Sequence, residues 1–439
     1  MIFLYNILFL LGNVIMLPFF VVKALTLEKR RATLLKRLSP GFRIPEFRER
    51  PIWIHTLSVG EVLSAVTLID AIKERYPDRA LVCSVSTQSG YQVATESLSK
   101  SVDLVFFFPY DFLLVVRHLV RRINPWLFLL VETDLWPNFL HEVKKNGVPA
   151  ILVNGRISPR SYTRYKRLSF FTKRVISNFA CCCMQTETDA KRIRSLGAAK
   201  EKVEVTGNIK FDQPLIVMPD GETNRLRASM RIGADARVFL AGSTHEGEEA
   251  VLLWCFEALR ESFANLVLVI APRDPHRASS VQRMFKKAGL LAPLRTELDN
   301  MDSGLIPEAI IVDTIGELRR LYAIADVVYV GKSMVNLGGQ NPLEPAAFKK
   351  PVLFGPSMFN FALIAGMLVR EGGAIQVDNR DSLLEQVKAL LRDTERSRLI
   401  GDRAYKVFST NQGAVARVLR VIERFSSPRG PETCQGPMP

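Results

Sequence analysis

The sequence predicts an α/β protein with two domains, each built on a parallel β-sheet that helices cover on both faces. Short runs of β-branched and aromatic residues alternate with longer amphipathic stretches, which is typical of strand, helix, strand units. This alternation stops at a proline-containing segment, 212–221, and then starts again. The chain has 439 residues, of which 48% are apolar, so it is long enough for two cores and too apolar to be disordered.

The alternation gives a definite order of elements. Strands of the first domain are expected at 51–56, 80–84, 104–107, 127–131, 150–153 and 181–185. Helices are expected between them, for example at 60–75, 91–98 and 113–123, where apolar residues return every three or four positions. Strands of the second domain are expected at 238–241, 266–270, 309–312, 327–330 and 352–354.

The first 22 residues carry no charged side chain and are mostly large and apolar. About 20 helical residues cover roughly the 30 Å hydrocarbon core of a bilayer, so this segment predicts a transmembrane anchor. A cleaved signal peptide is the alternative, but no basic residue precedes the apolar run and no small-x-small cleavage site follows it. Nine Lys or Arg against three Glu follow at 23–50, and the positive-inside rule then predicts a cytoplasmic location for the rest of the chain.

The formal net charge of +15 points to anionic partners: nucleic acid, phosphorylated metabolites or anionic lipid headgroups. The segment 156–174 has seven basic residues, no acidic residue and four Tyr or Phe residues. Such a segment suits stacking on nucleic-acid bases or contact with a membrane interface, and we favour the membrane because of the anchor. Six cysteines, three of them consecutive at 181–183, indicate a reduced compartment and no disulfide scaffold.

Three charged residues of the first half follow predicted strands or lie beside the linker. Glu61 ends IHTLSVGE, Glu132 begins ETDLWPN, and Lys210 lies in VTGNIKFD, near the expected cleft between the domains. Ligands of open parallel sheets collect at the carboxyl ends of strands, so all three are candidate site residues. The plainer alternatives are a Glu61 that complements a helix dipole, worth roughly 0.3 to 1 kcal/mol, and a solvated surface lysine at 210.

In the second half, the richest stretch is GGQNPLEP at 338–345. Asn341 can cap a helix, Pro342 suits a first helical position, and Glu344 stands where a capping-box carboxylate would. The two preceding glycines, Gly338 and Gly339, are left unexplained by a helix start and suit a backbone-bound phosphate. The sequence has no Walker loop, G-x-G-x-x-G, H-E-x-x-H, paired-cysteine or D-x-D motif, so no cofactor and no metal site is expected.

These motifs together resemble the 3-deoxy-D-manno-octulosonic acid (Kdo) transferases, the membrane-tethered enzymes that add Kdo to the lipid A precursor of Gram-negative bacteria. The resemblance covers nearly the whole chain and is carried, in order, by the anchor, SVGE, STQSGY, FFPYD, ETDLWPN, VNGRIS, VTGNIKFD, GSTHEGEE, DTIGEL and GGQNPLEP. It departs from the family at Asp134, where many relatives have Glu, and at Lys332, where a glycine is common.

The resemblance implies a GT-B architecture, with two Rossmann-like domains facing across a cleft, and an inverting, metal-independent transfer from CMP-Kdo to lipid IVA that releases CMP. It implies Glu61 as general base, and Glu132 and Lys210 as stabilisers of the transition state. The CMP site is implied at Pro272, Arg273, Ile315, Gly316, Glu317, Asn341, Pro342, Leu343 and Glu344.

The expected organisation is an anchor at 1–22, a basic juxtamembrane segment at 23–50, an acceptor domain at 51–211, a linker at 212–222, a nucleotide domain at 223–425 and a disordered tail at 426–439. The expected location is the inner membrane, single-pass, with both domains in the cytoplasm. Two alternatives remain at this point: a GT-B enzyme that uses a UDP-sugar, and a membrane-anchored nucleic-acid-binding protein.

Overall fold

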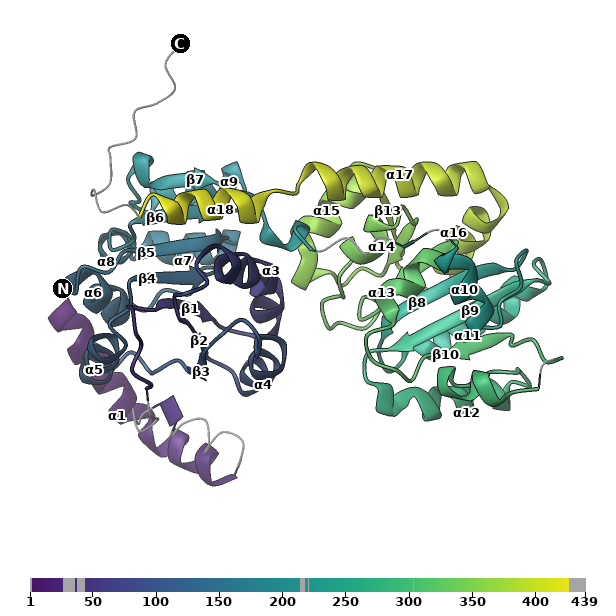
Figure 1. Cartoon of the computed structure of the whole chain (residues 1–439), viewed down its shortest axis with the longest axis horizontal. Helices are drawn as coiled ribbons and strands as arrows, with labels where there is room; N and C mark the ends of the chain where they lie inside the picture. The colour runs from purple at the N-terminus through teal and green to yellow at the C-terminus, as the bar shows by residue number, and fades with distance from the viewer. Residues whose placement is uncertain are drawn as a thin grey trace, which may run out of the picture. The chain divides into compact units, whose positions relative to one another are not determined.

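A computed structural model describes residues 2–26, 36–37, 44–213, 218–219, 221–302 and 304–425, with the side chains of 17–26 left out. The chain divides into two compact units (Figure 1). The first unit is formed by Met1–Gln213 together with Gln412–Pro439, and the second by Pro214–Asn411. Each contains one parallel sheet with helices on both faces.

The first sheet has seven parallel strands in the order β3-β2-β1-β4-β5-β6-β7. The strands are β1 (Ile52–Thr56), β2 (Leu81–Val85), β3 (Leu104–Phe107), β4 (Leu127–Val131), β5 (Ala150–Gly155), β6 (Cys181–Met184) and β7 (Val203–Val205). The helices of this unit are α1 (Ile2–Thr26), α3 (Val59–Arg75), α4 (Gln88–Ser97), α5 (Leu113–Ile123), α6 (Pro137–Lys145), α7 (Pro159–Arg167), α8 (Ser169–Ile176), α9 (Glu187–Ser195) and α18 (Ala414–Glu423). Strands β1, β2, β4 and β5 are buried along their whole length, as expected for a sheet covered on both faces.

The second sheet has six parallel strands in the order β10-β9-β8-β11-β12-β13. The strands are β8 (Arg237–Thr244), β9 (Leu266–Pro272), β10 (Ala309–Ile311), β11 (Val327–Val330), β12 (Val352–Phe354) and β13 (Ala374–Gln376). The helices are α10 (Glu222–Ser229), α11 (Glu248–Arg260), α12 (Ala278–Lys287), α13 (Leu318–Leu321), α14 (Leu343–Ala347), α15 (Ala362–Arg370), α16 (Arg380–Arg392) and α17 (Thr394–Thr410).

Both sheets reverse their strand order once, and this reversal positions the candidate sites. In the first sheet β1 lies between β2 and β4, and in the second β8 lies between β9 and β11. The connections on either side of such a point run over opposite faces of the sheet, which leaves a crevice at the carboxyl ends of the two central strands. The loops after β1, β4, β8 and β11 are therefore the places where a ligand is expected.

The predicted strands are all present, and two short strands were missed. β7 and β13 have three residues each and lie at sheet edges, where their alternation of apolar residues is too brief to be recognised. The described part of the predicted linker contains the start of α10, because this helix begins at Glu222. Five cysteines, Cys83, Cys255 and the three at 181–183, are buried and free.

Helix α18 belongs to the first unit, although its residues were expected at the end of the second domain, 223–425. Its apolar face, which includes Val418 and Ile422, is buried in the core of the first unit. The carboxylate of Asp212 accepts hydrogen bonds from the backbone N–H groups of Gly413 (2.6 Å) and Val415 (2.5 Å). The chain thus returns to the first unit because a strongly amphipathic last helix completes that core. The predicted tail, 426–439, lies outside the described residues.

Helix α1 is held against the first unit by one face. The hydroxyl of Tyr5 donates to Asp111 Oδ2 (3.0 Å), and the side-chain amides of Asn6 and Asn138 bond each other (3.0 and 2.7 Å). The aromatic ring of Phe9 lies 5.2 Å from that of Phe112, between centroids. The exposed large residues are Phe3, Leu4, Ile7, Leu8, Leu10, Leu11, Val14, Ile15 and Met16. Among the residues whose side chains are described, no helix combines the length and the apolar character needed to cross a bilayer.

Candidate active site

Glu61 lies in the first turn of α3. This helix follows β1 in the chain (Figure 1). The Oε2 atom of Glu61 accepts a hydrogen bond from the backbone N–H of Leu57 (2.5 Å). The pKa of Glu61 is raised to about 8, mainly by burial and next by the charge of the nearby Glu132, while the hydrogen bond from the Leu57 N–H and the charge of Lys210 oppose the rise. A carboxylic acid with this pKa exchanges a proton near neutral pH, as a general base must.

Glu132 follows β4 in the left-handed region, with φ of 60°, and its N–H donates to the carbonyl of Val153 (2.9 Å). A non-glycine residue in this region is uncommon, and such positions cluster at functional sites. The ammonium group of Lys210 lies 3.4 Å from Glu132 Oε1. The short turn that carries Lys210 is fixed by Asn154, whose Oδ1 accepts a hydrogen bond from the N–H of Ile209 (3.2 Å).

These three residues come together because β1 and β4 are neighbours in the sheet. Glu61 follows one of these strands, Glu132 follows the other, and Lys210 reaches the same point from the turn after β7. The structure thus assembles one site from residues 149 positions apart in sequence, between Glu61 and Lys210. The plainer alternatives for Glu61 and Lys210, a dipole partner and a solvated lysine, do not account for this grouping.

Sequence reasoning missed the contributions of three further side chains beside this site, those of Asp134, Arg37 and His55. Burial raises the pKa of Asp134, whose Oδ2 accepts a hydrogen bond from Trp136 Nε1 (2.8 Å), while the charge of Arg37 opposes the rise. Arg37 was counted only within the basic juxtamembrane segment, yet its Nε donates to the carbonyl of Phe108 (2.8 Å). No spacing rule connects residue 37 with 134, so the sequence carried no signal for this contact.

His55 is fully buried at the end of β1, with Nε2 4.0 Å from Asp134 Oδ2. Burial lowers the pKa of His55 to about 3, so the imidazole is neutral at physiological pH. Its Nδ1 lies 2.9 Å from the carbonyl oxygen of Ser84, and its ring stacks on that of Phe108. His55 therefore packs beneath Asp134 as a neutral side chain, through its contacts with Ser84 and Phe108. It does not form an ion pair with Asp134 at neutral pH.

The second unit gathers the residues expected to hold the nucleotide on loops after β9 and β10 and at the start of α14. Pro272 ends β9, and the N–H of the exposed Arg273 donates to the carbonyl of Thr244 (3.0 Å). Ile315 is 88% exposed, an unusual state for a large apolar side chain, and Gly316 has φ of 92°. The loop is held by Glu317, whose Oε1 lies 3.6 Å from Arg295 Nε.

The predicted helix start at 341–344 is confirmed in part. The side chain of Asn341 caps it, because its Oδ1 accepts a hydrogen bond from the N–H of Leu343 (3.1 Å). Pro342 is the residue that precedes the helix. Glu344 does not close a capping box: the helix begins one residue later than that motif requires, and Glu344 Oε1 lies 3.2 Å from Arg319 Nε.

Gly338 and Gly339 have a structural explanation that the sequence did not suggest. Both adopt positive φ, 96° and 73°, which glycine tolerates without strain. A Cβ atom on Gly338 would lie 2.5 Å from the ring of Phe359, and one on Gly339 would lie 2.2 Å from Met358 Sδ. Close packing thus requires these glycines, and they are no independent sign of a bound phosphate.

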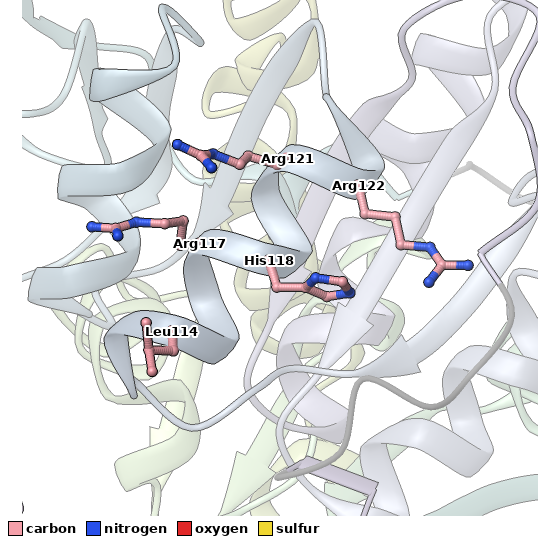
Figure 2. Close-up of a pocket in the computed structure, with 5 residues that line it drawn as sticks. All are labelled: Leu114, Arg117, His118, Arg121 and Arg122. Atoms are coloured by element: carbon pink, nitrogen blue, oxygen red, sulfur yellow. The ribbon is translucent and has the colours of Figure 1, made fainter.

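Two open hollows of the first unit lie elsewhere, on basic helices. One, of about 400 Å³, is bordered by Leu114, Arg117, His118, Arg121 and Arg122 on α5 (Figure 2). The other, of about 640 Å³, is bordered by Arg160, Ser161, Thr163, Arg164 and Arg167 on α7. Both are lined mainly by cations. In the described part of the chain, no three His, Cys, Asp or Glu side chains are grouped so that they could hold a metal ion.

Comparisons with known proteins show the family to which the chain belongs. Residues 29–213 match the family described as 3-deoxy-D-manno-octulosonic-acid transferase (kdotransferase). The chain is 34% identical to the 3-deoxy-D-manno-octulosonic acid transferase of Haemophilus influenzae over 379 residues, which cover 85% of this chain and 87% of that protein. It is 38% identical to a bifunctional glycosyltransferase/methyltransferase of Fusobacterium nucleatum over 366 residues, 83% of this chain and 56% of that protein.

Solved structures support the fold. The UDP-GlcNAc 2-epimerase of Neisseria meningitidis, determined with UDP-GlcNAc bound, superimposes with a TM-score of 0.56 at 12% identity. This match covers 85% of this chain and 99% of the epimerase. A glycosyltransferase of Rickettsia africae gives the same TM-score at 11% identity and covers 87% of this chain. At these identities the likeness shows a GT-B-like fold with two Rossmann-like sheets.

Proposed function

We propose a reaction for this chain from the premise that it belongs to the 3-deoxy-D-manno-octulosonic acid (Kdo) transferase family. The members of this family are glycosyltransferases of lipopolysaccharide biosynthesis. The chain transfers Kdo from CMP-Kdo to a lipid A precursor, lipid IVA, and releases CMP. The transfer inverts the anomeric carbon and needs no metal ion. The observation that carries the proposal is the carboxyl group of Glu61, with a pKa raised to about 8, beside the Lys210–Glu132 ion pair.

Glu61 supplies the base that the acceptor requires. A sugar hydroxyl is a poor nucleophile at neutral pH, and a carboxylate within hydrogen-bond reach typically accelerates such a step 10² to 10⁴-fold. The hydroxyl oxygen forms a bond to the anomeric carbon, its proton passes to Glu61, and the bond from that carbon to the phosphate oxygen breaks. CMP leaves with the bonding electrons. One direct displacement without a covalent intermediate gives inversion.

Cationic side chains stabilise the departing group. CMP leaves as a nucleoside monophosphate, so less charge develops than on a diphosphate, and the positive groups of Lys210 and Arg273 suit this role. Glu132 holds Lys210 in place through the 3.4 Å ion pair. The exposed side chain of Ile315 offers an apolar surface for the cytosine ring, and Glu344 offers acceptors for the ribose hydroxyls.

We also propose attachment to the inner membrane through α1, with both domains on the cytoplasmic side. One face of α1 is held by Tyr5 and Asn6, while the opposite face exposes leucine side chains such as Leu4, Leu8 and Leu11. The arginine-lined hollows on α5 and α7 belong to the same unit and suit anionic headgroups. The single pass expected from 1–22 stays a prediction.

The direct test is incubation of the purified protein with CMP-Kdo and tetra-acylated lipid A precursor, followed by mass spectrometry of the lipid. We expect a mass increase of one or more Kdo units, unchanged in excess EDTA. Lipid modified by UDP-sugars and not by CMP-Kdo would assign a different glycosyltransferase activity. Loss of transfer in EDTA, with recovery on adding Mg²⁺, would contradict the metal-independent mechanism. Steep salt-dependent RNA or DNA binding without any transfer would favour the nucleic-acid-binding alternative.

A further inference from the structure

Two residues at the reversal point of the second sheet have a strained backbone. Ser243 lies near the end of β8 with φ of 57°, and Lys332 follows β11 with φ of 63°. β8 and β11 are neighbours, and a Cβ atom on Gly331 would lie 2.5 Å from the carbonyl oxygen of Ser243. The two strained positions, one at the irregular end of β8 and one in the loop after β11, are therefore neighbours at the place where the topology predicts a ligand.

A buried carboxylate fixes both loops. Glu248 is 1% exposed and accepts hydrogen bonds from the backbone N–H groups of His245 (2.9 Å), Lys332 (2.7 Å), Ser333 (3.0 Å) and Met334 (3.1 Å). It also accepts one from the hydroxyl of Tyr329 (2.8 Å). The backbone of Lys332 is thus fixed by hydrogen bonds to the buried Glu248.

The same loop supports the stretch expected to bind the nucleotide. The carbonyl of Lys332 accepts a hydrogen bond from the N–H of Gly339 (2.8 Å), and the carbonyl of Gly331 accepts one from the N–H of Gln340 (3.1 Å). Lys332 therefore joins the loop after β8, through Glu248, to the loop that ends at Asn341.

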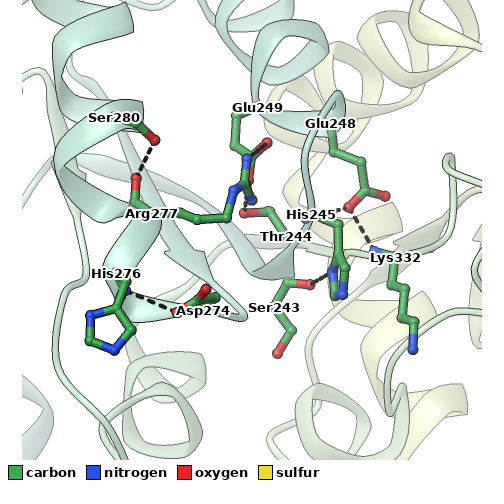
Figure 3. A network of polar contacts seen from close by, with 10 residues as sticks. All are labelled: Ser243, Thr244, His245, Glu248, Glu249, Asp274, His276, Arg277, Ser280 and Lys332. Atoms are coloured by element: carbon green, nitrogen blue, oxygen red, sulfur yellow. Dashed lines mark hydrogen bonds and ion pairs between the residues drawn. The ribbon is translucent and has the colours of Figure 1, made fainter. Parts of the chain in front are cut away.

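The side chain of Lys332 has no role in this support. Glycine adopts a positive φ without strain, so the fold alone favours glycine at this position. The lysine is half-buried, and within the described residues no acidic group forms an ion pair with its ammonium. In Figure 3, the side chain of Lys332 points away from Glu248, in the same direction as the side chain of Ser243. A fixed backbone thus presents a cation and a hydroxyl at the reversal point.

We propose that Lys332 and the hydroxyl of Ser243 bind an anionic oxygen group of the donor. This inference rests on the proposed function, because CMP-Kdo carries two such groups, the carboxylate of the sugar and the phosphate. An ammonium group bonded to either contributes strongly because the interaction is charge-assisted. Lys332 is then a donor-binding residue of this chain.

The test compares dissociation constants of CMP-Kdo and CMP, measured by calorimetry on the full-length protein. Lys332→Asn removes the charge and keeps a residue that tolerates positive φ, whereas Lys332→Arg keeps the charge. We expect Lys332→Asn to weaken CMP-Kdo binding about 10- to 100-fold and Lys332→Arg to stay within about threefold of the unmodified protein. An unchanged CMP affinity in Lys332→Asn identifies the sugar carboxylate as the partner, and an equal loss for both ligands identifies the phosphate.

Lys349 provides a matched control. It has a positive φ of 57°, precedes β12 at the opposite end of the sheet, and its ammonium lies 5.1 Å from the ring centroid of Tyr405. Lys349→Asn should bind both ligands as the unmodified protein does. Lys332→Asn with unchanged affinity for both ligands would overturn the inference and leave the proposed function intact. No binding of CMP-Kdo by the unmodified protein would instead overturn the proposed function.

Discussion

The ammonium group of Lys210 lies 3.4 Å from Oε1 of Glu132, and both groups act on the carboxyl group of Glu61. Glu132 raises the pKa of Glu61, and Lys210 lowers it. The two partners of the ion pair thus have opposite effects on the pKa of Glu61. A change to either partner is therefore expected to shift the pH at which Glu61 ionises. This coupling predicts effects of single substitutions on both the transfer rate and its pH dependence.

Glu61→Gln should abolish the base and leave donor binding intact. We expect transfer to fall at least 100-fold, since general-base catalysis is typically worth 10² to 10⁴-fold. The affinity for CMP should be unchanged, because the expected nucleotide residues lie in the other unit. The measurements are a transfer assay and calorimetry with CMP. Glu74→Gln, an exposed residue on the same helix, is the control and should retain the full rate. Equal rates in both variants would remove Glu61 from the base role.

Glu61→Gln should also stabilise the protein at alkaline pH. The pKa of Glu61 is about 8 in the folded protein, above its ordinary value of 4.5, so the folded state favours the protonated form. This contribution is fully present below about pH 4.5 and is lost as the pH rises through 8. Glutamine cannot ionise, so the Tm difference between the variant and the unmodified protein should grow from pH 5 to pH 9. A constant difference would show that Glu61 is not held in its protonated form.

Lys210→Ala should lower turnover, by roughly 10- to 1,000-fold for the loss of one transition-state partner. It should also raise the pH at which the rate levels off, because Lys210 lowers the pKa of Glu61. Pre-steady-state rates across pH test both effects. Lys200→Ala, an exposed lysine in the preceding turn, should change neither. Full activity of Lys210→Ala would reduce Lys210 to a structural ion-pair partner of Glu132.

The exposed face of α1 should carry membrane attachment. Replacing Leu8 and Leu11, which are 60% and 54% exposed, by glutamine removes apolar surface without disturbing the contacts of Tyr5 and Asn6. We expect the fraction that floats with anionic vesicles to fall several-fold, most clearly at high salt, where the attraction of the arginines is screened. Leu399→Gln, on α17 in the other unit, is the control. Unchanged flotation of the double variant would place the attachment elsewhere.

The fold could be predicted from sequence because long buried strands and amphipathic helices have strong periodic patterns. Several boundaries agree to the residue, as for β4 at Leu127–Val131 and β11 at Val327–Val330. The short edge strand β13 has no comparable pattern. The return of α18 to the first unit depends on tertiary contacts with Asp212 and the first core, and no local pattern indicates which of two cores a helix completes.

The candidate site could be predicted in part, because Glu61 and Glu132 follow strands that proved to be neighbours. The contributions of Arg37 and His55 depend on burial and on contacts between distant segments, so residue type alone could not identify them. Gly338 and Gly339 illustrate another limit of sequence patterns. The glycine pair suggested a phosphate site, and close packing against residues 358 and 359 is a second reason for glycine that no local pattern indicates.

The most direct test of the central claim is the single-turnover rate of Kdo transfer, measured from pH 6 to pH 10 at saturating CMP-Kdo and lipid acceptor. The unmodified protein should gain about tenfold per pH unit and level off near pH 8, the pKa of Glu61, as one group loses its proton. Glu61→Gln should be at least 100-fold slower at the plateau and lack this dependence. The same profile and the same rate in both proteins would contradict the account.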